Sequence, residues 1–207
     1  MQNATNNNSL IAAATITAEL GEVRSIAKSM SLGVMNAKAI SLRAGESARG
    51  FKPVTDFIDE MARDVMKLIV HISREAHQLS QTSVKRNHLQ NSMRRFYEVV
   101  RQDNTPKYIE SLNPILAKIE KEQQYHDRQF MLIASKLENL LEDILLCTRG
   151  AHVVATSSRV EASHTQEFRV SLEVVADDTQ HATEQIRSHV THSQRLLKDV
   201  IQQITHR

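Results

Sequence analysis

Apolar or small residues recur at alternating spacings of three and four along nearly the whole chain. The first such seam contains Ile16, Leu20, Val23, Ala27, Met30, Val34 and Ala37, and it continues to Ser41 and Ala44. This spacing keeps one face of an α-helix apolar over many turns, as in helices of coiled-coil bundles. An aromatic content of 4% with no Trp disfavours a sheet. The sequence therefore predicts an all-α fold.

The seam resumes in three later stretches. The second stretch contains Ile58, Met61, Val65, Leu68, Ile72, Leu79, Leu89, Met93, Phe96 and Val100. The third contains Ile109, Leu112, Leu116, Ile119, Gln123, His126, Phe130, Ile133, Leu137, Leu140, Ile144 and Cys147, and the fourth runs from Phe168 to Ile204. The second stretch predicts a helix of about 50 residues, roughly 75 Å long. A helix of that length is typical of a coiled-coil bundle.

Turn signals divide these stretches. Glycines mark a reversal near 43–51, and the run from Gln102 to Pro106 marks a second. We place a third near 162–167, because the apolar pattern continues past the alternative position, Gly150. Ser9 is available to cap the first helix, and Asn113-Pro114 is another candidate helix start.

Together these signals predict an elongated antiparallel four-helix coiled-coil bundle made of two helical hairpins. Residues 1–103 form the first hairpin, with its tip near 43–51, and residues 104–207 form the second, with its tip near 162–167. The sequence leaves open whether the four helices pack within one chain or between the chains of a homodimer.

The first tip contains a distinctive run of residues. It reads Asn36-Ala37-Lys38-Ala39-Ile40-Ser41-Leu42-Arg43-Ala44-Gly45-Glu46-Ser47-Ala48-Arg49-Gly50-Phe51-Lys52-Pro53-Val54. Small residues allow two helices to approach closely, the glycines permit a tight reversal, and Pro53 is tolerated in a first helical turn. The run is therefore typical of a helical hairpin tip.

This tip resembles that of the cytoplasmic signalling domain of bacterial methyl-accepting chemotaxis receptors. The family pattern runs roughly N-A-A-x-E-A-A-R-A-G-E-x-G-R-G-F-A-V-V-A. The chain matches it in register at Asn36, Ala37, Arg43-Ala44-Gly45-Glu46, Arg49-Gly50-Phe51 and Val54. Ile26-Ala27 and Ala62 also fall in register, so the resemblance covers residues 26–62.

In that family the tip binds the chemotaxis histidine kinase and its coupling protein and packs receptor dimers into trimers. The resemblance therefore implies a non-enzymatic signalling or adaptor protein that docks the kinase, the coupling protein or both, with chemoreceptors as a further candidate partner. The partner-binding positions that it implies are Asn36, Arg43, Glu46, Arg49, Phe51 and Val54.

Composition bears on the partners and the cellular location that we expect for this protein. A net charge of +2 with 24% charged residues gives no reason to expect a nucleic acid or membrane partner. The single cysteine, Cys147, cannot form an internal disulfide, and no segment approaches the roughly 18 apolar residues that cross a bilayer. We therefore expect a cytoplasmic protein without membrane insertion.

Other residue patterns suggest chemistry less strongly. His181, His189 and His192 lie near one helical face, and Glu161 and His164 give one E-x-x-H motif. A di-iron bundle needs that motif twice. We expect no metal and no cofactor, and the alternative is a metal-binding helical bundle that uses these histidines.

Three further patterns complete the alternatives. Phe51 stands where a phosphate-binding loop starting at Gly45 needs Lys, and no strand precedes the turn, which disfavours a nucleotide-binding loop. Cys147 and His152 are five residues apart and off each other's helical face, so we expect a buried cysteine and no enzyme. A degenerate scaffold that binds another partner through a basic surface remains open, and its residues would be Lys85, Arg86, Arg94, Arg95, Arg101 and Lys107.

Overall fold

The computed structural model describes residues 2–102, 106–164 and 168–205, and nearly all of them are helical. In chain order the elements are α1 (Gln2–Ala44), a short 3₁₀ helix η1 (Gly45–Ala48), α2 (Phe51–Gln102), α3 (Pro106–Arg149), α4 (Ala151–Ser163) and α5 (Arg169–Thr205). The described residues contain no strand. The predicted all-α fold is confirmed.

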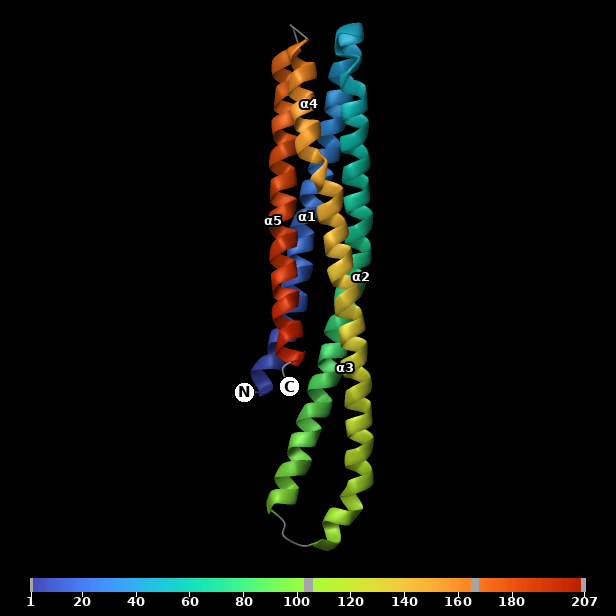
Figure 1. Ribbon diagram of the computed structural model, residues 1–207, viewed down its shortest axis with the longest axis vertical. Coiled ribbons are helices and arrows are strands. Elements are labelled where there is room, and N and C mark those ends of the chain that lie inside the picture. Colours follow the sequence, from blue (N-terminus) through green and yellow to red (C-terminus); the bar gives the residue numbers. More distant parts are fainter. Residues whose placement is uncertain (1, 103–105, 165–167, 206–207) are drawn as a thin grey trace.

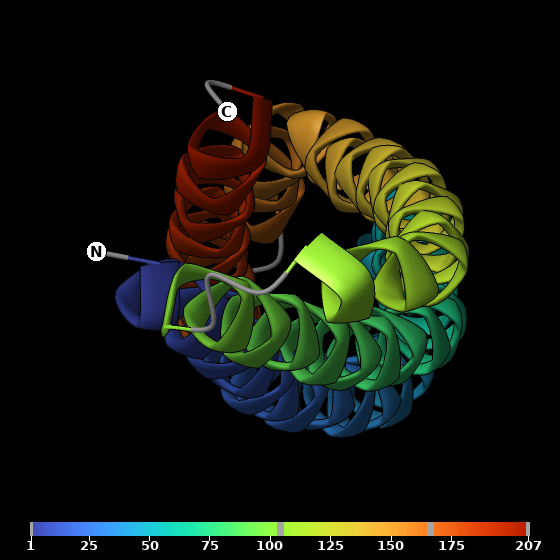
Figure 2. The same ribbon diagram turned by 90° about the horizontal axis from the view of Figure 1, so that it is seen from below.

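The helices lie side by side along one long axis (Figure 1). Seen from below, α5 lies beside α1, α1 beside α2, and α2 beside α3 (Figure 2). α4 continues the line of α3 and packs against α5 and α2. The result is an elongated molecule in which α1 and α2 meet at one tip, and the start of α1 and the end of α5 lie at the other end of α1 and α5.

One core runs between the helices. All the members of the first seam from Ile16 to Ala37 are buried. The largest fully buried side chains elsewhere include Phe51, Ile58, Ile72, Leu79, Phe130, Leu137, Leu141, Ile144, Leu172 and Ile186. Because burying one such side chain contributes about 1.5–3 kcal/mol, packing along these seams is the main source of stability.

Two helix starts differ from the sequence predictions. α1 begins at Gln2 and not after Ser9, whose residue is only 1% exposed inside the helix. Ser9, Ala12 and Ala13 are small residues on the buried face of α1, so Ser9 packs inside the helix and does not cap it. Asn113-Pro114 starts no helix, because α3 already begins at Pro106 and passes through Pro114.

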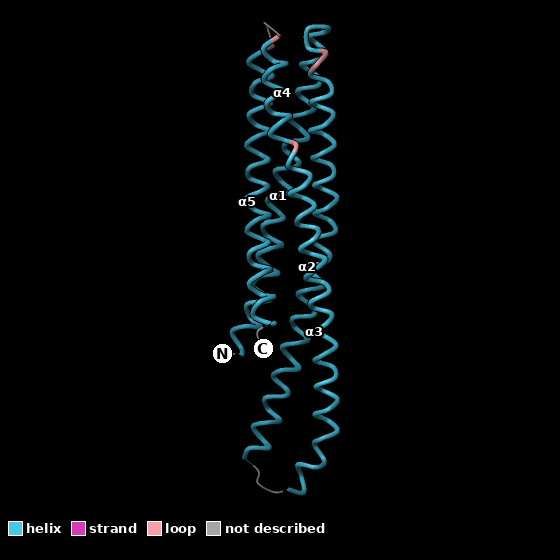
Figure 3. The backbone as a smooth tube through the Cα atoms, in the orientation of Figure 1, coloured by secondary structure: helices cyan, strands magenta, loops and turns pink. Residues whose placement is uncertain are grey.

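The predicted reversals fall partly outside the described residues. Residues 103–105 separate the end of α2 at Gln102 from the start of α3 at Pro106, and residues 165–167 lie between α4 and α5. Figure 3 shows where the helices stop on either side of these stretches and at the first tip.

Gly150 interrupts the helix between α3 and α4 without reversing the chain (Figure 3). Its backbone stays near helical angles, with φ −72° and ψ −17°. A Cβ at this position would lie 2.9 Å from Cζ of Phe57, so α2 approaches closely here. Gly150 therefore marks a close contact between helices, and the chain continues in the same direction to the second tip.

At the end opposite the tips, α2 and α3 continue past the ends of α1 and α5 (Figure 1). Arg86 is the last buried residue of α2 among those whose burial is described. Its side chain is 3% exposed, its Nε donates to Oδ1 of Asp127 at 2.6 Å, and its guanidinium lies 4.8 Å from the ring centroid of Phe130. The ion pair and the ring contact together compensate the cost of burying this charge.

Candidate functional site

The first tip is a tight turn built on glycine. Gly45 has φ +60°, the left-handed region that other residues adopt only at a cost, and it ends α1. The chain then makes the single turn η1, after which the backbone N–H of Arg49 donates to the carbonyl of Glu46 at 3.3 Å. The Ser41 hydroxyl donates to the Ala48 carbonyl at 3.1 Å, which ties α1 to the returning chain.

An ion-pair cluster joins α1 and α2 just below the turn. Nζ of Lys38 lies 2.9 Å from Oδ1 of Asp56 and 3.4 Å from Oδ2 of Asp59. The hydrogen bond between the Lys38 ammonium and Asp56 raises the pKa of Lys38 and lowers the pKa of Asp56. Both groups are therefore charged at neutral pH, and they hold the two helices in register.

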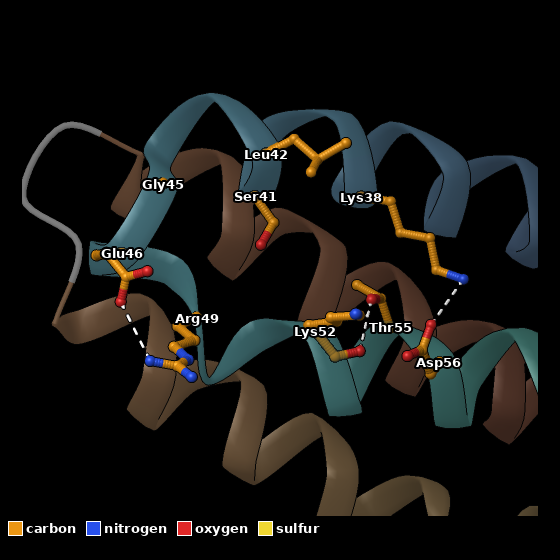
Figure 4. A pocket seen from close by; sticks show the side chains of 9 residues that line it. All are labelled: Lys38, Ser41, Leu42, Gly45, Glu46, Arg49, Lys52, Thr55 and Asp56. Atoms are coloured by element: carbon orange, nitrogen blue, oxygen red, sulfur yellow. Dashed lines mark hydrogen bonds and ion pairs between the residues drawn. The ribbon is translucent and has the colours of Figure 1, made fainter.

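A groove of about 360 Å³ opens between these helices (Figure 4). Its lining residues come from α1, the turn and α2: Lys38, Ser41, Leu42, Gly45, Glu46, Arg49, Lys52, Thr55 and Asp56. Leu42 is 83% exposed, more than any other large apolar side chain among the described residues. An exposed leucine surrounded by charges of both signs is suited to contact with another protein.

The predicted partner-binding residues separate into three groups. Glu46 and Arg49 line the groove, with a distance of 3.4 Å between Oε2 and Nη1. Asn36 and Arg43 are exposed seven residues apart on α1, so they share a face of that helix. Phe51 and Val54 are 0% and 8% exposed and pack into the core. In this structure, Phe51 and Val54 support the tip from inside rather than presenting a surface.

Seven groove residues were absent from the predicted set: Lys38, Ser41, Leu42, Gly45, Lys52, Thr55 and Asp56. The hairpin symmetry contained a usable signal, because positions 38 and 56 are equally far from position 47. Leu42 also departs from the apolar seam directly before the turn, which predicts an exposed apolar side chain.

His189 and His192, which the sequence suggests as metal ligands, instead contact one carboxylate, that of Glu19. Nδ1 of His189 lies 2.5 Å from Oε2 of Glu19, and Nδ1 of His192 lies 3.0 Å from Oε1 of the same carboxylate. The hydrogen bond with His189 is the main cause that lowers the pKa of Glu19. Within residues 2–102, 106–164 and 168–205, no group of three or more His, Cys, Asp or Glu side chains could hold a metal ion.

Cys147 is half-buried, whereas the sequence predicts a buried cysteine. Burial, and next the negative charges of Asp64 and Asp143, raise the pKa of its thiol. The thiol is therefore protonated at neutral pH, which disfavours a role as a nucleophile.

Comparison with known proteins assigns the chain to no family. No protein-family model matches the chain, and no curated protein is detectably similar to it in sequence. In the described part of the chain, no helix combines the length and the apolar character needed to cross a membrane.

Proposed function

We propose that this chain is a non-enzymatic, cytoplasmic, chemoreceptor-like signalling or adaptor protein. It docks a chemotaxis histidine kinase, the coupling protein of that kinase, or both, through the tip groove. We further propose that the helices act as an antiparallel four-helix coiled-coil bundle of two hairpins, residues 1–103 and 104–207, whose packing sets the geometry of the tip.

The exposure of the receptor-like charges carries this proposal. Arg43, Glu46 and Arg49 match the receptor pattern, and all three are exposed at one end of the molecule. The ion pair between Glu46 and Arg49 joins side chains that are 88% and 82% exposed, so it adds little to stability. Breaking this ion pair costs little free energy, so both side chains can form new ion pairs with a binding partner.

The groove supplies apolar area between those charges. Leu42 stands at its edge, and the Lys38–Asp56 pair closes it on the side away from the turn (Figure 4). Burial of an exposed leucine at the centre of an interface, surrounded by polar contacts, is a common source of binding free energy. Phe51 and Val54 contribute indirectly, since their burial fixes the start of α2.

A binding titration with purified kinase and coupling protein tests the proposal. Wild-type protein should bind at least one of them, and Leu42→Asp should weaken that binding by roughly 10- to 30-fold. Arg43→Ala and Glu46→Ala should each weaken it by several-fold, because they remove exposed charges at the contact.

Two variants at the start of α5, which lies at the same end of the molecule but belongs to the second hairpin, serve as controls (Figure 1). Val170→Asp alters an apolar side chain that is 72% exposed, and Arg169→Ala breaks an exposed ion pair with Glu173. Neither should change the affinity. If wild type binds neither protein, or if the control variants lose as much affinity as the tip variants, the tip is not a docking site for this machinery.

A further inference from the structure

The base of the molecule carries an apolar seam that the chain itself does not cover. We define the base extension as residues 87–102 of α2 together with residues 106–129 of α3. No residue of 87–99 or 113–129 is buried, although these ranges hold the continuing seam. The half-buried members of that seam are Leu89, Met93, Phe96, Leu116 and Ile119.

The seam changes abruptly where two helices stop. Leu79, Ser83 and Arg86 on α2 are 1%, 3% and 2% exposed, and Phe130 on α3 is 0% exposed. Beyond them α1 and α5 end, and only α2 and α3 continue (Figures 1 and 2). The seam residues of α2 and α3 are therefore covered by neighbouring helices up to Arg86 and Phe130, whereas in the base extension only α2 and α3 remain to cover each other.

We propose that the base extension is a homodimer interface, in which two copies pack base to base about a two-fold axis. Each extension lies beside the other and supplies the two helices that the seam lacks. Met93 and Phe96 of each copy then become central core residues. Such an interface is self-complementary, as a two-fold contact requires.

The shape of the base extension favours a second copy over a longer partner. A segment seated on this seam must stop where α1 and α5 end, because those helices occupy the same positions higher up (Figure 1). An inverted second extension has the required two helices, of which one ends at Gln102 and the other begins at Pro106.

Charge and size also permit this contact. Residues 87–129 hold seven Lys or Arg and six Asp or Glu, so two copies meet with little net repulsion. The extension is about 24 Å long, measured along α2. It is two helices wide, which is about 20 Å. A face of these dimensions has an area of about 480 Å², close to the roughly 500 Å² per partner at the lower end of specific interfaces.

Sedimentation velocity over a range of protein concentrations tests the dimer, and small-angle scattering tests its geometry. We expect a species of twice the 23.5 kDa of one chain. Its length should be roughly 130 Å, since each copy is about 78 Å long along α2 and the overlap is about 24 Å. A protein that stays monomeric at all concentrations, or a dimer no longer than one copy, would overturn the proposal.

Two substitutions locate the contact. Phe96→Asp places a charge in the seam and should raise the dissociation constant at least about tenfold. Leu132→Asp is the matched control, because Leu132 is an apolar side chain of α3 that is 53% exposed and lies outside the base extension, and it should leave the constant unchanged. Equal dimerisation of Phe96→Asp and wild type would contradict the proposal, and the scattering length of wild type decides the matter even if Phe96→Asp fails to fold.

Discussion

At Glu19, one carboxylate of α1 accepts hydrogen bonds from two histidines of α5, with distances of 2.5 Å to His189 and 3.0 Å to His192. These bonds hold the folded-state pKa of Glu19 below its ordinary value. A carboxyl group with a lowered folded pKa stabilises the fold at pH values above its unfolded pKa of about 4.3. The stabilisation is lost as the pH falls from there through the folded pKa.

We therefore expect Glu19→Gln to lower the free energy of unfolding by about 1 kcal/mol near neutral pH. In acid, the variant and the wild type should be equally stable. Urea unfolding measured between about pH 3 and pH 7 checks both effects. Glu22→Gln, an exposed carboxyl group one turn away, is the control and should show neither effect. A constant difference between Glu19→Gln and wild type at every pH would show that the contact is not electrostatic.

The tip shows what residue patterns can and cannot predict. The family pattern placed Phe51 and Val54 among partner-binding residues, yet the spacing of 51, 54, 58, 61 and 65 continues the apolar seam of α2. That spacing alone assigns both side chains to the core, where the structure has them. A family motif identifies residues that are shared among its members. The spacing of apolar residues along the helix then indicates which of these residues are buried and which face solvent.

At the scale of elements, the seams predicted helix positions well because the same spacing specifies both helix and buried face. The errors occurred where a single residue was taken as a boundary. Ser and Pro are common at helix starts, but Ser9 lies inside α1 and Pro114 lies inside α3, so neither residue marks a helix boundary. The uncovered seam of the base extension was also unpredictable, since the pattern does not reveal where the other helices end.

The turn after α1 leads to a prediction about glycine. Gly45→Ala should destabilise the protein by about 1–2 kcal/mol, because φ +60° is unfavourable for alanine although nothing lies within 4 Å of the new Cβ. Gly33→Ala is the matched control in the middle of α1, also with open space, and should stabilise by up to about 1 kcal/mol. Thermal unfolding of both variants checks the opposite signs, and a stabilising Gly45→Ala would refute the assigned turn geometry.

At the scale of the molecule, the two ends serve different purposes in our account. The tip carries exposed charges, a groove and Leu42, whereas the base extension carries an uncovered apolar seam. Base-to-base pairing would leave the tips free at opposite ends of the dimer, so the two contacts can form independently. Failure of the dimer would leave the docking proposal intact, and the reverse also holds.

Hydrogen–deuterium exchange with and without the kinase and coupling protein tests the docking of the tip most directly. The short turn from Gly45 to Ala48 has few helical hydrogen bonds and should exchange fast in the free protein. We predict that binding slows exchange in residues 38–56 and leaves the base extension unchanged. Protection confined to the base extension or to α5, with unchanged exchange at the tip, would contradict the central claim.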